Sequence, residues 1–312
     1  MKNIKLVSQT LKNKRIGIAL GSGSARGWSH IGVIRELVQL GIEPDIVCGT
    51  SVGAVIGAFY VCGHLDKLES WGRQLSRRKI VQFMDIRLIS RGGFIEGEKL
   101  IKFFSRFMGD KSIEDCQKRF GAVATSLTTG QEIWFTKGSF LDAIRASISL
   151  PGFLTPVKYG DDWLVDGGLV NPVPVSLCRA LGAQLVISVN LNGERIGRNF
   201  NRNISKTDHS KQISDEANLI NKITSGLKER ISYRKDAVSG NPGLFDVLAS
   251  FIHIMQDRIT RSRMAGDPPD IILAPRLNHL ALLDFNRAAE AIEEGRACVR
   301  RAMPLFQDMV EV

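Results

Sequence analysis

Cysteine is scarce in this chain of 312 residues, and its five cysteines are odd in number and widely spread. No two have the Cys-x-x-Cys spacing, so the sequence predicts neither a disulfide framework nor a zinc site. Long apolar runs are also missing, because no stretch approaches the roughly 18 apolar residues of a membrane span. Residues 1–15 lack the apolar core of a signal peptide. These absences favour a protein of the reducing cytoplasm.

Acidic residues are too few to balance the basic ones: 32 Asp and Glu against 42 Lys and Arg give a net charge of +10 at pH 7. A basic excess favours anionic partners such as membrane phospholipid or nucleic acid, and it does not choose between them. The sequence has no recognisable nucleic-acid-binding module, so we expect no nucleic-acid partner. Peripheral contact with an anionic membrane, such as the inner membrane, stays open.

Glycine is abundant, and the chain is organised around a glycine-containing stretch, residues 45–63. A short apolar run breaks there at Gly-Thr-Ser-Val-Gly and resumes as a helix of small residues, with Ser51 at the apex. This pattern is typical of the nucleophile elbow of acyl hydrolases, in which Gly49 and Gly53 would let strand and helix pack closely. The alternative is a glycine-rich turn that carries no chemistry.

A second glycine-rich turn, residues 21–27, follows residues 15–20, which resemble a buried first strand. Apolar positions at helical spacing predict a helix over residues 31–40, and Gly41 is placed to end it. With the elbow strand and helix, the N-terminal part has the order strand, helix, strand, helix. That order predicts an α/β fold with a mainly parallel sheet covered by helices.

Three functions are considered for the turn at 21–27. A dinucleotide fingerprint would need glycine where Arg26 stands, and a phosphate-binding loop would need a Gly-Lys-Ser or Gly-Lys-Thr sequence that is missing. The third is an oxyanion hole, whose backbone N–H groups face the negative oxygen that forms when Ser51 attacks a carbonyl. The candidate donors are Gly23, Ser24, Ala25 and Arg26.

Ordered blocks of the sequence resemble the patatin-like phospholipases, in particular small bacterial members related to neuropathy target esterase. The turn is similar to the family's Gly-Gly-Gly-x-Arg-Gly loop, and the further blocks are residues 92–100, 146–153 and 165–174. The resemblance covers roughly residues 15–190. Ser22 and Ser24 replace family glycines, so a positive φ at residue 24 would carry strain.

The resemblance implies a three-layer α/β/α hydrolase that acts on lipid acyl esters, as a phospholipase, lysophospholipase or carboxylesterase, through an acyl-enzyme on Ser51. Asp166, which begins an Asp-Gly-Gly motif with Gly167 and Gly168, would be the base of a Ser-Asp dyad. An ordinary carboxylate is a weak base for a hydroxyl, so Asp166 should lie within hydrogen-bond reach of Ser51 and have a raised pKa. None of the five histidines has a context that favours catalysis. No metal or organic cofactor is implied.

Two further expectations concern basic residues. Residues 71–107 mix bulky apolar side chains with Arg77, Arg78 and Lys79, and basic amphipathic segments bind lipid interfaces. We expect substrate choice and membrane contact in this stretch, with an ordinary surface helix as the alternative. Arg26 is expected to brace the oxyanion turn and not to bind a substrate phosphate.

The predicted organisation has three parts: a catalytic domain over 15–190, a polar insertion over 191–243 that we expect to be mobile, and a helical segment over 244–312 that packs on the catalytic domain. Strands are predicted at 120–126, 132–135, 184–190 and 270–274, and late helices at 245–263 and 285–306. One alternative to hydrolysis is a regulatory or scaffolding protein of the same fold with little turnover. The presence of both Ser51 and Asp166 argues against it.

Overall fold

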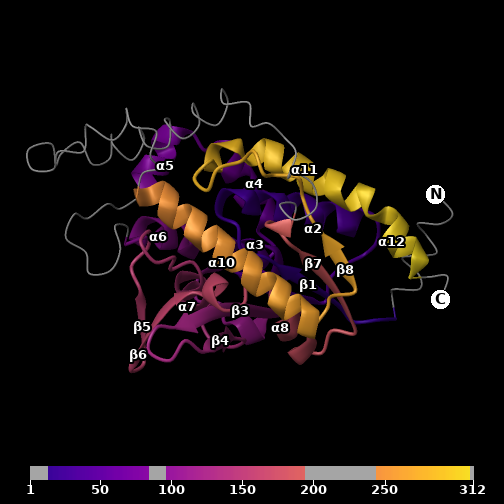
Figure 1. The fold of residues 1–312 in the computed structure, drawn as a ribbon, viewed down its shortest axis with the longest axis horizontal. Coiled ribbons are helices and arrows are strands. Elements are labelled where there is room, and N and C mark those ends of the chain that lie inside the picture. Colours follow the sequence, from indigo (N-terminus) through magenta and orange to yellow (C-terminus); the bar gives the residue numbers. More distant parts are fainter. Residues whose placement is uncertain (1–12, 84–95, 194–243, 310–312) are drawn as a thin grey trace, which may run out of the picture.

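The predicted α/β/α architecture is confirmed: a mainly parallel sheet lies between two layers of helices (Figure 1). The computed structural model describes residues 13–83, 96–193 and 244–309. The strands are β1 (Ile16–Leu20), β2 (Ile46–Thr50), β3 (Arg119–Ser126), β4 (Glu132–Phe135), β5 (Val157–Tyr159), β6 (Asp162–Asp166), β7 (Leu185–Val189) and β8 (Ile271–Leu273). Their order is β5-β6-β3-β2-β1-β7-β8, and β4 also pairs with β3. The pairs that involve β4, β5 or β6 are antiparallel, and the other pairs are parallel.

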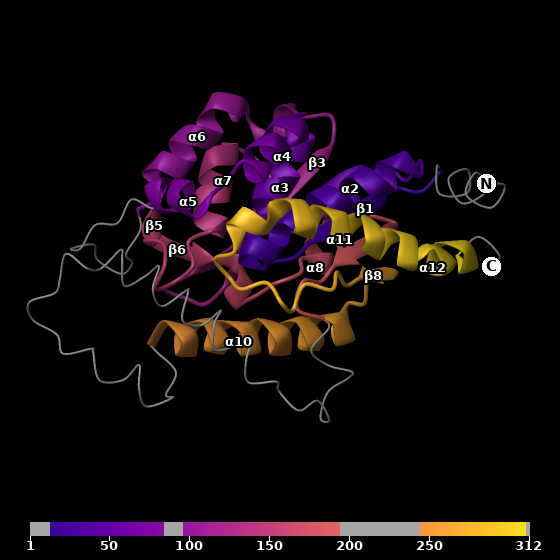
Figure 2. The ribbon, with the colours of Figure 1, turned by 90° about the horizontal axis from the view of Figure 1, so that it is seen from above.

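Helices cover both faces of the sheet, and Figure 2 shows α10 on the opposite side from α3 and α4. On the side of the larger core lie α2 (Ser29–Gln39), α3 (Val52–Val61), α4 (Leu65–Arg73), α5 (Arg77–Phe83), α6 (Glu98–Met108), α7 (Phe140–Ser147), α11 (Ala288–Arg301) and α12 (Met303–Asp308). On the other side lie α8 (Val175–Ala180) and α10 (Leu244–Gly266). The sheet is therefore shielded from water on both faces, which explains why its central strands are continuous apolar runs.

The central strand β1 shows how the two cores are built. Ile16, Ile18 and Leu20 pack into the larger core, whereas Ala19 packs into the smaller core beside α8. This alternation follows from the two-residue period of a strand. All five residues of β1 are buried.

Helices α2 and α11 touch through their backbones. A Cβ atom at Gly32 would lie 1.8 Å from the carbonyl oxygen of Ile292, and one at Gly295 would lie 2.1 Å from the carbonyl oxygen of Ser29. Beside this contact the buried carboxylate of Glu36 accepts hydrogen bonds of 2.8 and 3.1 Å from Arg300. These contacts fix α11 against α2, the helix that follows the glycine-rich turn.

Most predicted elements are found within a residue or two of their expected bounds, but the last helix is different. The single helix predicted over 285–306 is wrong, because a 3₁₀ turn (Phe285–Arg287), α11 and α12 replace it. Pro304 lies in the first turn of α12, where its missing N–H and fixed φ are tolerated, whereas the interior of one long helix would exclude it. The amphipathic pattern of the sequence continues across the boundary between α11 and α12, so the pattern did not reveal that boundary.

The described aromatic residues of segment 71–107 pack against one another and against the larger core. Trp71 stacks on Phe103 with ring centroids 4.6 Å apart, and Phe104 packs edge-on against Phe59 at 5.3 Å. Arg77, Arg78 and Lys79 are exposed. Trp71, Phe103 and Phe104 thus pack into or against the core, while the described basic residues of the segment lie at the surface. Residues 84–95 of this segment and 194–243 of the predicted insertion lie outside the described residues.

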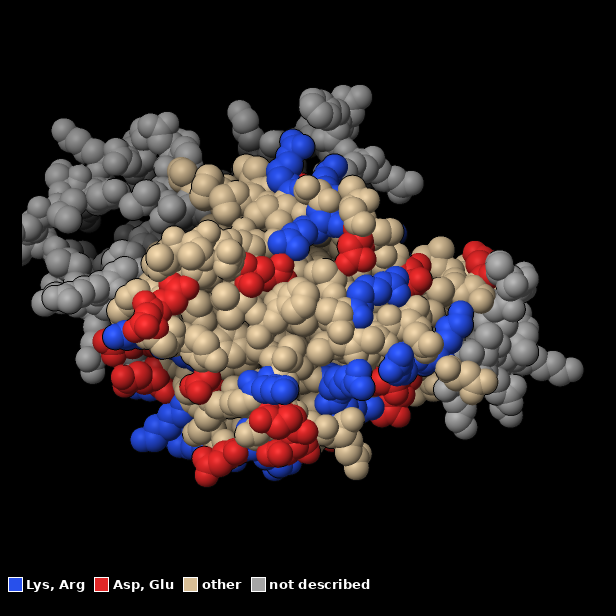
Figure 3. All heavy atoms as spheres, turned by 90° about the horizontal axis from the view of Figure 1, so that it is seen from below, with Lys and Arg blue, Asp and Glu red and all other residues tan. Residues whose placement is uncertain are grey.

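Charge is interspersed on the face drawn in Figure 3, where basic and acidic side chains lie among one another and among uncharged residues. On this face the net positive charge of the chain does not gather into one basic patch. Within the described residues, none of the helices combines the length and the apolar character that crossing a bilayer requires.

Candidate active site

Ser51 occupies a strained turn between β2 and α3. Its φ of 57° and ψ of −123° are strongly disfavoured for a residue with a side chain. A Cβ atom at Gly49 would lie 2.3 Å from the carbonyl carbon of Gly53, and one at Gly53 would lie 2.1 Å from the carbonyl oxygen of Leu20. Both glycines are therefore required for the close approach of strand and helix that holds Ser51 at the apex.

The register of β3 brings Ser51 and Asp166 together. Strand β2 pairs with β3 as far as Val123, and β6 pairs with it from Ala124, while β4 overlaps both pairings and so takes the opposite edge. Strands β2 and β6 thus meet end to end on one edge of β3. Because β6 is antiparallel, its last residue, Asp166, faces the residue that follows β2. The Ser51 hydroxyl donates a hydrogen bond of 2.6 Å to Oδ2 of Asp166.

Neighbouring groups hold this pair in position. Oδ1 of Asp166 accepts a 2.7 Å hydrogen bond from the N–H of Gly168. The hydroxyl of Thr125 donates to the Asp166 carbonyl at 2.9 Å. The hydroxyl of Ser147 accepts from the N–H of Ser51 at 2.8 Å and donates to the Val123 carbonyl at 2.6 Å. The backbone around both side chains is thus tied to the sheet and to α7.

Burial raises the pKa of Asp166 to about 6, although the hydrogen bonds from Ser51 and from the N–H of Gly168 act in the opposite direction. The side chain is 1% exposed, so its charged form loses hydration. A carboxyl with this pKa is ionised at neutral pH and is a better proton acceptor than an ordinary aspartate. The direction agrees with the expectation from the sequence.

The glycine-rich turn forms a short 3₁₀ helix, η1 (Ser24–Trp28), beside the elbow. Ser24 has a φ of 52°, so the strain expected at this position is present. The N–H of Ala25 donates to the Leu282 carbonyl at 3.1 Å, and that of Arg26 to the Gly23 carbonyl at 3.2 Å. Two of the four candidate oxyanion donors are therefore already engaged. Gly23 is the N-cap of η1 and Ser24 is its first residue, and at this end a helix leaves its N–H groups without internal acceptors.

The side chains of His30 and Arg26 hold the glycine-rich turn in position. The ring of His30 is fully buried, its Nε2 lies 2.8 Å from the Gly21 carbonyl, and burial lowers its pKa to about 4. The ring is therefore neutral and donates to that carbonyl. The Arg26 guanidinium donates to the Leu191 carbonyl at 3.3 Å and lies 3.1 and 3.2 Å from the ring nitrogens of His253. These contacts link the turn to α10 and to the segment after β7.

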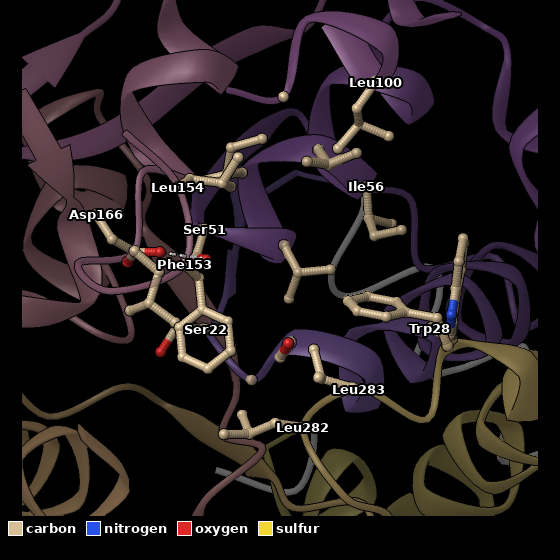
Figure 4. A pocket seen from close by; sticks show the side chains of 18 of the residues that line it. Ser22, Trp28, Ser51, Ile56, Leu100, Phe153, Leu154, Asp166, Leu282 and Leu283 are labelled. Atoms are coloured by element: carbon tan, nitrogen blue, oxygen red, sulfur yellow. Dashed lines mark hydrogen bonds between the residues drawn. The ribbon is translucent and has the colours of Figure 1, made fainter. Parts of the chain in front are cut away.

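A cavity of about 220 Å³ opens from the Ser51–Asp166 pair. Figure 4 shows the Ser51 hydroxyl directed at the Asp166 carboxylate at one end, with Ile56, Leu100 and Trp28 at the other. Most of the wall is aliphatic or aromatic: Val52, Val55, Ile56, Leu68, Trp71, Leu75, Ile80, Leu100, Phe104, Ile148, Leu150, Phe153 and Leu154 contribute. An apolar chain attached to a carbonyl group fits such a cavity, because the chain would be buried while the carbonyl meets the polar pair.

The family model of the patatin-like phospholipases matches residues 18–179, which include the elbow, the glycine-rich turn and the Asp-Gly-Gly motif. The chain belongs to the patatin-like phospholipase family. An uncharacterized NTE family protein of Mycobacterium tuberculosis is 31% identical, over 94% of this chain and 92% of its own length. Lysophospholipase NTE1 of Pyricularia oryzae is 26% identical, over 93% of this chain but 18% of its own.

A solved structure, VipD from Legionella pneumophila, is similar with a TM-score of 0.43 and 12% identity, over 95% of this chain and 67% of its own. Membership of the patatin-like phospholipase family supports a lipid hydrolase at the level of the family.

Helix α10, which lies beyond the part matched by the patatin-like family model, supplies cavity residues that the sequence analysis missed. Ile252, His253 and Gln256 of this helix line the cavity. The polar members of this buried face, His253 and Gln256, were the available signal, because they share a helical face with Ile252. Both residues are about 200 positions from Ser51 in the sequence, so no local pattern showed that they lie beside the same cavity. Among the described residues, no cluster of His, Cys, Asp and Glu side chains is able to hold a metal ion.

Proposed function

We propose that this chain hydrolyses carboxylic esters of lipids with Ser51 as nucleophile and Asp166 as base. The observation that carries the proposal is the 2.6 Å hydrogen bond from the Ser51 hydroxyl to a buried carboxylate, at the end of an apolar cavity. Phospholipids, lysophospholipids and simple carboxylic esters share the required bond. A regulatory or scaffolding role has no need for a strained serine bonded to a carboxylate of raised pKa.

In the first half of the reaction, Asp166 takes the hydroxyl proton of Ser51 while Oγ attacks the ester carbonyl carbon. The tetrahedral oxyanion then collapses, and the alcohol leaves with the proton from Asp166. The products of this step are the free alcohol and an acyl-enzyme on Ser51. The 2.6 Å contact means that this proton moves without rearrangement of the dyad.

The oxyanion requires donors, and we assign this role to the N–H groups of Gly23 and Ser24. Both residues line the cavity, as Ser51 does, and they are the N-cap and the first residue of η1. A Cβ atom at Gly23 would lie 2.5 Å from a methyl carbon of Leu191, so glycine is the residue that the packing admits there. The positive φ of Ser24 is the conformational cost of presenting the turn in this form.

Single and double substitutions test the dyad. Ser51→Ala and Asp166→Asn should each reduce release of fatty acid from phospholipid, lysophospholipid and p-nitrophenyl ester substrates by at least about 10³-fold, and the double variant should be no worse, because the two residues act in one step. Asp162→Asn, at the partly exposed start of β6, is the matched control. Turnover by Asp166→Asn close to the wild-type rate would reject this mechanism. Labelling of Ser51 by a fluorophosphonate probe separates an esterase from a regulatory protein.

We further propose that the protein meets its substrate at an anionic membrane surface, as a peripheral protein of the cytoplasmic side. The exposed side chains of Arg77, Arg78 and Lys79 support this contact, and each basic residue near an anionic surface is worth about 1 kcal/mol. Replacing the three with glutamate should weaken binding to anionic vesicles in a salt-dependent way and leave hydrolysis of a soluble short-chain ester unchanged. Equal vesicle binding at low salt would reject the contact.

A further inference from the structure

The side-chain amide of Gln256 is a buried polar group with no role in the steps above. It is 6% exposed and lines the cavity, and it forms no hydrogen bond with another residue of the described parts of the chain. Its amide atoms are not among the fully buried polar atoms that lack a partner in the described residues, so they face the open space of the cavity. A water molecule or a substrate group in the cavity is able to complete their hydrogen bonds.

Its position beside the dyad restricts what that partner is. A Cβ atom at Gly168 would lie 2.4 Å from Nε2 of Gln256 and 2.9 Å from Oδ1 of Asp166. These two distances place Nε2 of Gln256 no more than 5.3 Å from Oδ1 of Asp166. A single water molecule, which spans two hydrogen bonds of about 2.8 Å each, is therefore able to bridge the amide and the carboxylate. The absence of a side chain at Gly168 is what allows α10 to bring the amide this close.

The reaction creates a need for such a water. Before acylation, Oδ2 of Asp166 accepts from the Ser51 hydroxyl, and Oδ1 accepts from the N–H of Gly168. After acylation, Ser51 Oγ is esterified and has no proton to donate, so Oδ2 loses its donor. The attacking water must lie beside this carboxylate, with a lone pair toward the acyl carbonyl carbon. One hydrogen bond to Asp166 does not fix this orientation, and a second partner does.

We propose that Gln256 is a further catalytic residue, whose amide holds the hydrolytic water against Asp166 in the second half of the reaction. This inference rests on the proposed function. The water gives one proton to Asp166 while its oxygen attacks the acyl carbonyl carbon. Ser51 Oγ then leaves with that proton, which releases the fatty acid and restores the dyad. An amide carries both donors and an acceptor, so its carbonyl oxygen is able to accept the second hydrogen of the water.

Single-turnover kinetics separate the two halves of the reaction. With enzyme in excess over a p-nitrophenyl ester, release of p-nitrophenolate measures acylation, and intact-mass analysis after acid quench follows the loss of the acyl group from Ser51. Gln256→Met keeps the side-chain volume and removes the hydrogen bonds. It should slow deacylation by about tenfold or more and leave acylation within about twofold. Hydroxylamine, a stronger nucleophile than water, should restore much of the deacylation rate.

Thr260→Val is the matched control. Thr260 lies one turn further along α10, is 2% exposed and has a buried hydroxyl without a partner within the described structure, yet it does not line the cavity. This variant should keep both wild-type rates.

Equal slowing of acylation and deacylation in Gln256→Met, or unchanged deacylation, would overturn the role of Gln256. If the wild type formed no acyl group on Ser51, the proposed function itself would fail. The two failures are therefore distinguishable.

Discussion

Replacing Asp166 with asparagine should make the protein inactive and, above about pH 6, more stable. Burial raises the pKa of this carboxyl from 3.8 to about 6 in the folded protein. The folded state therefore binds more protons than the unfolded state between these two values, and the wild type loses stability as the pH rises through this window. Asparagine keeps a neutral group at the site at every pH, so it avoids this loss.

The difference between the two pKa values corresponds to about 3 kcal/mol once Asp166 is ionised. Asparagine retains the local hydrogen bonds, since its carbonyl oxygen accepts from the N–H of Gly168 and its amide is able to donate to Oγ of Ser51. The difference in free energy of unfolding between Asp166→Asn and wild type should grow from near zero at pH 4 to about 2–3 kcal/mol at pH 8.

Urea unfolding of both proteins at pH 4, 5, 6, 7 and 8 measures this difference, and other titrating groups cancel in it because both proteins share them. Asp162→Asn is the contrast, because hydrogen bonds from Ser126 and Thr128 lower the pKa of that exposed carboxyl. This variant should gain no stability as the pH rises. A difference for Asp166→Asn that stays constant or shrinks between pH 4 and pH 8 would refute the reasoning.

Three further outcomes follow from the same geometry. The kcat/KM for a soluble p-nitrophenyl ester should rise with pH through about 6, because Asp166 must be ionised to accept a proton; a flat profile from pH 5 to 8 would contradict this. Ser51→Gly should exceed Ser51→Ala in urea stability by about 1 kcal/mol, because φ 57° and ψ −123° favour glycine. Gly295→Val should lower stability by more than about 2 kcal/mol, because its Cβ would meet the Ser29 carbonyl oxygen, whereas Gly266→Ala, with open space, should be neutral in the same unfolding assay.

The sequence predicted the centre of the sheet because its signals there are local. A short apolar run followed by a glycine-rich turn and a helix occurs twice, at 15–40 and 45–63, and such a repeat has few arrangements other than parallel strands. The proximity of Ser51 and Asp166 was implied by the family resemblance. Its physical cause, the end-to-end meeting of β2 and β6 on one edge of β3, depends on pairing between distant segments that no local pattern shows.

The misses have the same cause. Gln256 approaches Gly168 only after α10 has returned across the Asp-Gly-Gly turn. The buried face of α10 includes polar His253 and Gln256, whereas apolar Phe251 and Ile254 are exposed, so apolar periodicity did not identify that face. The aromatic residues of 71–107 suggested a lipid interface, and the stacking of Trp71 on Phe103 shows that these two side chains also pack against each other. The expected membrane contact of this segment stays a prediction. The engaged N–H groups of Ala25 and Arg26 follow from the closure of η1, which the glycine pattern left undetermined.

Because α10 lines the cavity, the residues of the proposed active site come from two separate parts of the chain. The proposed nucleophile, base and oxyanion turn lie within residues 18–179, whereas Ile252, His253 and Gln256 come from beyond the family match. Under the proposed mechanism, substitutions in α10 alter the fate of the acyl-enzyme while Ser51 and Asp166 stay unchanged. Hydrolysis and transfer of the acyl group differ only in the molecule that attacks the acyl-enzyme, which is water in the first case and an alcohol in the second. A single helix face thus becomes the place where evolution or engineering would convert one activity into the other.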